Sequence, residues 1–197
     1  NNLYIKTSGG TYDTEDDLRI DLNDGVLTVS GDVHLEIDGG DALSFNANNT
    51  TINIVEDLNL LLTDGNDAEL IVDGSTLTIG DSLIIYNNGD ANYTDNEIDD
   101  NSIVNIGSSW YNTNVDGTRF YTRIGLNGSN TANVSVGEDL VINNLASSGN
   151  SIINQYDGSK LTIVRDYIVT NTCDGSGDYH SHYLDEDDDT LIVGNDL

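Results

Sequence analysis

One phrase of alternating apolar and polar residues recurs through the chain, and this repeat constrains the fold more than any other feature. LTVSGDVHLEI at 27–37 returns as INIVEDLNLLL at 52–62, LTIGDSLIIYN at 77–87, VSVGEDLVINN at 134–144 and LTIVRDYIVTN at 161–171. Self-similarity at a period of 20–50 residues is the sequence signature of stacked structural units. The sequence therefore predicts a repeat architecture for the chain.

Each copy has the same internal order: apolar, any, apolar, two turn residues, Asp or Ser, then apolar. The copies start 25, 25, 27, 30, 27 and 30 residues apart. Leu3 and Ile5 are interpreted as a degraded earlier copy, placed 24 residues before Leu27. The seven clear copies begin at Leu27, Ile52, Leu77, Val104, Val134, Leu161 and Leu191.

Alternation of apolar residues over three to six positions is typical of a strand with one buried face. A third alternating run precedes several copies, as in Leu18-Ile20-Leu22 and Leu43-Phe45, and Gly, Asn and Asp mark the junctions. Three short strands and three turns per unit predict an all-β, right-handed, three-sided parallel β-helix of about seven coils, each of roughly 25 residues. A β-sandwich has no reason to repeat a three-strand phrase at a fixed period.

This interpretation makes one sharp geometric prediction. Val29, Ile54 and Ile79 lie directly above one another in successive coils, within a single domain spanning 1–197. The longer intervals predict loop insertions near 86–102, 107–133 and 173–190, which leave one face of the solenoid.

The phrase LTV-x-x-D-L-x-I-x-N resembles the coils of extracellular right-handed β-helix proteins, such as bacterial adhesins and autotransporter passenger domains. The resemblance covers nearly the whole chain and concerns architecture. It implies a secreted or cell-surface protein, and it carries no site residues with it.

The charge balance limits the partners of the chain. Thirty-five Asp and Glu face six Lys and Arg, a formal net charge of −29, and only seven of the acids are Glu. Such a field repels phosphate, so nucleic acid and anionic membrane surfaces are excluded as partners. No run of 18 apolar residues is present to span a bilayer. A chain that needed only negative charge could use Glu equally well, whereas Asp suits turns and cation binding.

Other features fit an extracellular location. Cys173 is the single cysteine, which precludes an intrachain disulfide, and the first residue is Asn1, as expected after removal of a leader or excision from a larger parent. Glycosylation motifs that could carry glycans stand at Asn48, Asn49, Asn92, Asn127 and Asn133.

The last copy, LIVGNDL, stops in mid-phrase. Open solenoid ends expose core and strand edges unless they are capped. Two expectations follow: the chain is a piece of a longer solenoid, or its copies form a homo-oligomer by head-to-tail stacking of coils. Head-to-tail contacts that do not close generate filaments.

Acidic residues in two of the expected insertions predict binding of a cation, calcium, which takes six to eight oxygen ligands. A plain solvated acidic loop is the alternative for both segments. The His-x-His pair in the second segment also leaves a transition-metal site open. The candidate ligands are Asp95 and Asp99 in the first segment, and Asp174, Asp178, His180, His182 and Asp185 in the second.

The function predicted from these features is a structural β-solenoid subunit of an extracellular filament, surface appendage or matrix, and not an enzyme. One alternative is an adhesin or carbohydrate-binding segment, with Trp110, Tyr111, Phe120 and Tyr121 as an aromatic platform. A second is a polysaccharide-degrading enzyme, with paired carboxylates or with Arg119 and Arg123 in a groove. A third is ice binding through the partial threonine row Thr28, Thr78 and Thr162.

Overall fold

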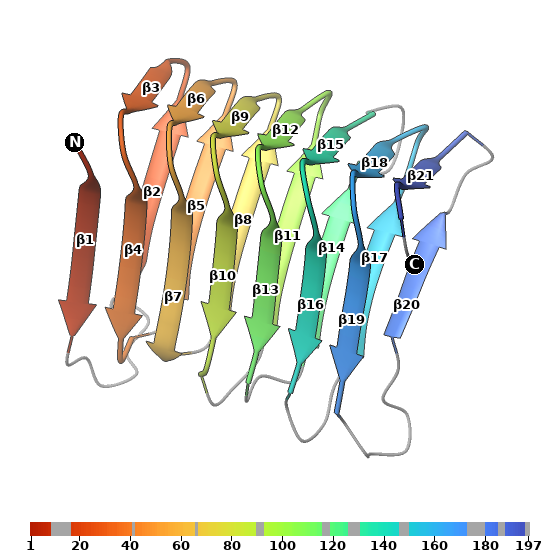
Figure 1. Cartoon of the computed structure of the whole chain (residues 1–197). Coiled ribbons are helices and arrows are strands. Elements are labelled where there is room, and N and C mark those ends of the chain that lie inside the picture. Colours follow the sequence, from red (N-terminus) through yellow and green to blue (C-terminus); the bar gives the residue numbers. More distant parts are fainter. Residues whose placement is uncertain are drawn as a thin grey trace.

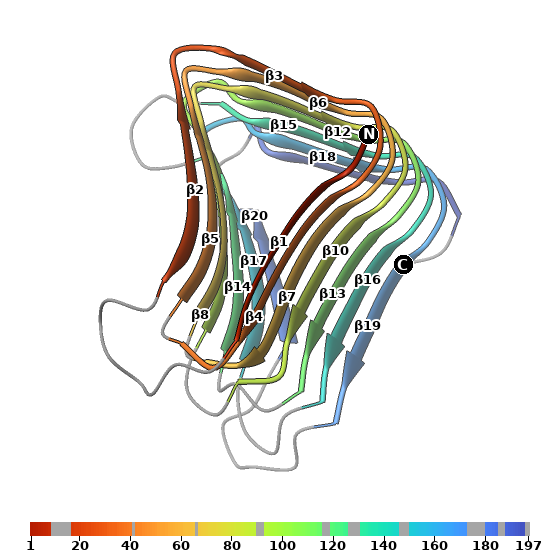
Figure 2. The same cartoon turned by 90° about the vertical axis from the view of Figure 1, so that its left-hand side faces the viewer.

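The computed structural model is a right-handed, three-sided parallel β-solenoid (Figures 1 and 2). It describes residues 1–8, 17–40, 42–65, 67–89, 93–115, 119–125, 131–145, 150–172, 180–184 and 188–195, in which all regular structure is β. Three parallel sheets of seven strands form the three walls, named here sheets A, B and C. One coil contributes one strand to A, then to B, then to C, so the chain makes seven coils (Figure 2).

The strands of each sheet follow one another at regular intervals along the chain. Sheet A contains β1 (Leu3–Ser8), β4 (Val33–Asp38), β7 (Leu58–Asp64), β10 (Leu83–Asn87), β13 (Trp110–Asn114), β16 (Leu140–Asn144) and β19 (Tyr167–Asn171). Sheet B contains β2 (Leu18–Asn23), β5 (Ala42–Asn48), β8 (Asp67–Asp73), β11 (Tyr93–Asp99), β14 (Arg119–Ile124), β17 (Asn150–Gln155) and β20 (His180–Leu184). Sheet C contains β3 (Val26–Val29), β6 (Thr51–Ile54), β9 (Thr76–Ile79), β12 (Ile103–Ile106), β15 (Asn133–Val136), β18 (Lys160–Ile163) and β21 (Thr190–Val193).

The predicted stacking of the repeat is confirmed in register. Val29 pairs with Ile54, and Ile54 pairs with Ile79, on adjacent strands of sheet C. The same holds for the first apolar residue of every copy, from Leu27 through to Leu191. The repeat intervals in the sequence are therefore the lengths of successive coils.

The placement of the N-terminal segment differs from the prediction. Leu3 pairs with Val33 and Ile5 with Leu35, so β1 belongs to sheet A and not to the sheet that contains Leu27. The offset from Leu3 to Val33 is one coil. Alternation alone could not identify the wall, because strands of sheets A and C show the same apolar-polar pattern.

The three ranges predicted as insertions also contain regular strands. β11 lies within 86–102, β13 and β14 within 107–133, and β20 within 173–190, each paired in parallel with its neighbours. Parts of these ranges are therefore strands of sheets A and B. The sequence of β11 lacks apolar alternation, because its inward side chains include Thr94 and Asn96.

The inward side chains of the first three coils are almost wholly aliphatic. Leu35 and Leu60 of sheet A, Leu70 of sheet B and Ile52 of sheet C are fully buried. In the next three coils, sheet C stays aliphatic inside, while sheets A and B carry buried amides and hydroxyls. The buried polar side chains at inward strand positions are Asn87, Thr94, Asn96, Asn112, Asn114, Thr122, Asn144, Ser151 and Gln155.

Short polar side chains link successive coils at the turn between sheets C and A. The N–H of Ser82 donates to Asp57 Oδ1 at 2.8 Å, and the N–H of Asp57 donates to Asp32 Oδ1 at 3.2 Å. The N–H of Asp166 donates to Asp139 Oδ1 at 3.2 Å in a later coil. This row is named the aspartate ladder. At these three positions a short carboxylate reaches the backbone of the coil stacked on it, which favours Asp over Glu there.

A second ladder lies at the turn between sheets B and C. Here the backbone N–H groups donate to the following coil, whereas in the aspartate ladder they donate to the preceding one. The N–H groups of Thr50 and Ser75 donate to the hydroxyls of Ser75 and Ser102, at 2.9 and 3.1 Å. The preceding turn residues have positive φ angles in several coils, a conformation that suits Asp, Asn and Gly. They are Asp24, Asn49, Gly74, Asp100 and Asp157.

Candidate functional site

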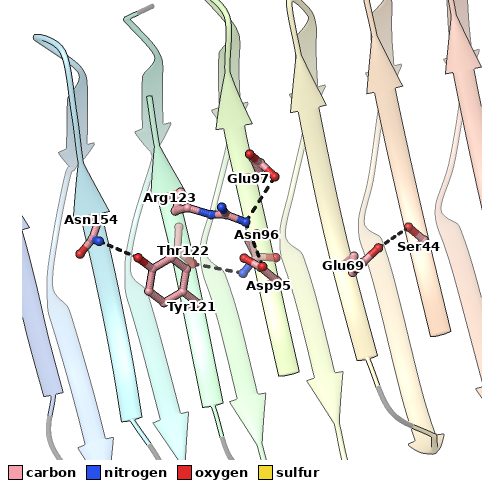
Figure 3. A network of polar contacts seen from close by, with 9 residues as sticks. All are labelled: Ser44, Glu69, Asp95, Asn96, Glu97, Tyr121, Thr122, Arg123 and Asn154. Atoms are coloured by element: carbon pink, nitrogen blue, oxygen red, sulfur yellow. Dashed lines mark hydrogen bonds and ion pairs between the residues drawn. The ribbon is translucent and has the colours of Figure 1, made fainter. Parts of the chain in front are cut away.

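Charged side chains gather on the outward face of sheet B (Figure 3). Arg123 of β14 lies beside β11 and donates through Nη2 to Asp95 Oδ2 at 3.0 Å and to Glu97 Oε2 at 3.3 Å. Tyr121 of β14 accepts a hydrogen bond from Asn154 of β17 at 2.7 Å. These contacts join consecutive coils along the sheet. Because the ion pairs are partly exposed, each contributes modestly to stability.

The two predicted calcium ligands of this region do not converge. Asp95 and Asp99 both lie on β11, four residues apart and on the same face, which separates them by roughly 13 Å. Calcium needs its oxygens within about 2.3–2.6 Å. One ion therefore cannot bind both carboxylates. Asp99 instead lies beside Asp73 of β8, its register partner.

Negative charge is incompletely compensated along this edge of sheet B. Burial, and then the charges of Asp100 and Asp99, raise the pKa of Asp73 above its usual range. Burial also raises the pKa of Glu97, more than the neighbouring Arg123 lowers it. Both shifts mean that the folded chain favours the protonated form of these groups. The arrangement attracts cations without forming a closed ligand set.

The second predicted metal segment is only partly described. His182 on β20 takes the register position beside Ile153, on the inward side, and its Nε2 lies 2.8 Å from Gln155 Oε1. Its ring meets the ring of Tyr167 edge-on at 5.8 Å between centroids. His180 lies on the same strand at the position beside Ser151. Asp174, Asp178 and Asp185 lie outside the described residues.

Within the described part of the chain, no group of three or more His, Cys, Asp or Glu side chains is placed to hold a metal ion. The calcium hypothesis therefore depends on the second segment and stays a prediction.

The predicted aromatic platform divides between the core and two different walls. Trp110 and Phe120 are buried, each 2% exposed, and fill the interior. Tyr111 faces outward on sheet A and is 39% exposed, whereas Tyr121 faces outward on sheet B. Strand alternation could have revealed part of this separation, because adjacent residues such as Trp110 and Tyr111 point to opposite faces.

A compact cluster that the sequence did not suggest links β1 to β4. Glu36 accepts hydrogen bonds from Lys6 Nζ at 2.6 Å and from the Tyr4 hydroxyl at 3.0 Å, and His34 Nε2 lies 3.3 Å from the same carboxylate. The Tyr4 and His34 rings are stacked at 4.6 Å. The Lys6 ammonium, followed by His34, lowers the pKa of Glu36 to about 2. The cluster fastens the first strand of sheet A to the second.

The outward face of sheet C, and that of sheet A from β7 onward, carry fewer charges than that of sheet B. On sheet C, Thr28, Thr78 and Thr162 do share one column, interrupted by Asn53, Asn105 and Ser135 as the sequence indicated. A shallow hollow on this sheet is lined by Asn105, Asn133, Val134, Ser135, Lys160 and Thr162. On sheet A, the outward residues from β7 onward are uncharged, apart from Asp64 at the end of β7.

Comparison of the chain with protein-family models, with curated proteins and with solved structures found no match. Within the described ranges, no helical segment has the length and apolarity needed to cross a bilayer.

Proposed function

We propose that the chain is a structural β-solenoid module of an extracellular filament, surface appendage or matrix, which extends by coil-on-coil stacking. The observation that carries the proposal is the continuity of the three parallel ladders through all seven coils. Backbone hydrogen bonds, aliphatic columns and two turn ladders all run along the same axis. Such an array resists bending because every coil is bonded to its neighbours on three walls.

Six strands make the proposed stacking contacts. Among the described strands, β1, β2 and β3 at one end and β19, β20 and β21 at the other pair on one side only. A parallel strand from another copy could extend each sheet without a change in register. Contacts of this head-to-tail kind form open filaments.

The net charge of −29 opposes this association, so cations must screen the approach of two copies. Calcium is the proposed counter-ion, because it binds carboxylate oxygens and the chain carries 35 Asp and Glu against six Lys and Arg.

A proline on the free edge of β3 tests the stacking. The N–H groups of Thr51 and Val55 donate to the carbonyls of Gly25 and Val29. In a parallel ladder this pattern directs the N–H of Thr28 to the opposite, unpaired edge. Thr28→Pro removes that donor without breaking a bond to β6, and Thr28→Val is the matched control that keeps it.

Negative-stain microscopy with calcium should show uniform filaments for the parent chain and for Thr28→Val, and single particles for Thr28→Pro. A chelator in buffer of matched ionic strength tests the role of calcium separately from screening. Monodisperse particles of the parent chain under every condition would refute assembly through the ends.

A further inference from the structure

The outward face of sheet A carries apolar side chains on five successive strands. From β7 to β19 it presents the apolar side chains Leu61, Ile84, Tyr86, Tyr111, Val141 and Ile168. Figure 1 looks onto this wall. Tyr111 and Ile168 are 39% and 43% exposed. We name this surface the neutral face. The largest contiguous apolar patch on a monomer, typically a few hundred Å², is frequently functional.

Polar but uncharged side chains complete the neutral face. Asn59, Thr113 and Asn143 stand among the apolar residues, and Asn143 Nδ2 lies 3.5 Å from Thr113 Oγ1. Register pairing sets Tyr111 between Ile84 and Val141 in one column, with Tyr86 and Thr113 side by side in the next. Amide and hydroxyl groups therefore flank aromatic and aliphatic surface along the axis of the solenoid.

A neutral polysaccharide fits this chemistry. We infer that the neutral face binds a neutral polysaccharide chain lying along the solenoid axis. The apolar C–H faces of sugar rings pack on Tyr111 and Tyr86, because aromatic side chains offer broad apolar surface with a polar tip. Sugar hydroxyls exchange hydrogen bonds with the amides and hydroxyls beside them. Anionic polymers are repelled by the net charge of −29.

A second copy of the chain fits the neutral face less well. Five strands about 4.8 Å apart, each offering two or three outward residues about 6.6 Å apart, give an area on the order of 400 Å². Stable protein interfaces bury roughly 800 Å² on each partner. A narrow, uncharged polymer needs a smaller contact area.

The test uses purified chain carrying Thr28→Pro, so that end-to-end assembly does not contribute to the signal. Retention on insoluble cellulose and chitin is measured by depletion from solution, with alginate-coated beads as the anionic arm. We expect retention on at least one neutral polymer and none on alginate. Tyr111→Ala and Tyr86→Ala should each weaken retention by roughly three- to tenfold. Tyr121→Ala, on the outward face of sheet B, is the matched control and should leave it unchanged.

Circular dichroism of each variant establishes that the fold is intact. The inference is overturned if neither neutral polymer retains the chain, if the double variant of Tyr86 and Tyr111 is retained as well as the parent, or if alginate is bound preferentially. A concentration-dependent dimer that Tyr111→Ala abolishes, without retention on polymer, would identify the occupant as a second copy and also overturn it. The filament proposal is unaffected by these outcomes, because it concerns the strand edges.

Discussion

The first three coils and the next three share one backbone but have different interiors. One inward column of sheet A is aliphatic except in the fifth coil, where it holds an amide. Its residues are Leu35, Leu60, Ile85, Asn112 and Ile142. In sheet B the column Phe45, Leu70, Asn96, Thr122 and Ile153 changes in the fourth and fifth coils. The parallel ladders continue through both columns. Backbone pairing therefore maintains the coil where side-chain packing is less favourable.

The polar interior is satisfied only in part. Asn96 Nδ2 donates to Thr122 Oγ1 at 3.1 Å, and Asn114 Nδ2 donates to Asn144 Oδ1 at 3.1 Å. Asn112 is 1% exposed, and neither its Oδ1 nor its Nδ2 has a hydrogen-bond partner among the described residues. Because a buried unpaired polar group costs free energy, the middle coils are expected to be the less stable part of the solenoid.

The largest effect on stability is expected from placing an amide in the aliphatic interior of the first three coils. Leu60→Asn should lower the free energy of unfolding by about 3–5 kcal/mol, since it removes buried methyl groups and leaves a polar side chain unpaired. The urea midpoint followed by circular dichroism measures this change. A urea midpoint for Leu60→Asn near that of the parent would show that the aliphatic interior accepts an amide as readily as the polar interior does.

The reciprocal change sharpens the comparison. Asn112→Leu should raise the free energy of unfolding by about 1–2 kcal/mol, because it replaces two unpaired polar atoms by apolar surface. Asn114→Leu is the control, since it removes the donor to Asn144 and should be destabilising. The same urea titration measures both. Destabilisation by Asn112→Leu equal to that of Asn114→Leu would show that Asn112 is not the weak point.

The first three coils and the next three also differ in how well the sequence predicts them. Leu27, Ile52 and Leu77 recur with aliphatic partners, so spacing alone gave the architecture and the register of sheet C. Thr94 and Asn96 interrupt the inward alternation of β11, so the sequence predicts an insertion where the structure has a strand. The site was harder to predict, because a wall is set by register between coils: Asp95 and Asp99 are close in sequence, yet Asp99 neighbours Asp73.

If only the interiors differ, an equivalent substitution in the aspartate ladder should lower the free energy of unfolding by the same amount in the first three coils and in the next three. Asp57→Ala leaves the N–H of Ser82 without its carboxylate acceptor and should lower the free energy of unfolding by about 1 kcal/mol. Asp57→Asn keeps an acceptor oxygen and should cost less. Asp139→Ala in the later half also loses the 2.8 Å ion pair with Arg165, so it should cost slightly more. Thermal unfolding compares the three variants. If Asp57→Ala leaves the stability unchanged, the aspartate ladder does not stabilise the solenoid.

Smaller, pH-dependent effects of opposite sign are expected from two acids. The pKa of Glu36 is lowered to about 2, so its stabilising contribution is present above the ordinary value near 4.5 and is lost as pH falls towards 2. Glu36→Gln should therefore lower the melting temperature at pH 7, and the difference from the parent should shrink on acidification. A constant difference between pH 7 and pH 3 would contradict this role for the carboxylate.

Asp73 should behave in the reverse way, at the boundary between the two halves. Its pKa is raised by burial and by Asp100 and Asp99, so the folded state is favoured below the ordinary value of 3.8 and loses that advantage as pH rises through the raised pKa. Asp73→Asn should therefore raise the melting temperature at pH 7 by a small amount that disappears in acid. Salt should reduce the same difference, because screening weakens repulsion between carboxylates at the surface. A lower melting temperature for Asp73→Asn at pH 7 would mean that Asp73 is held by a favourable partner, and the acidic edge of sheet B would then be a source of stability.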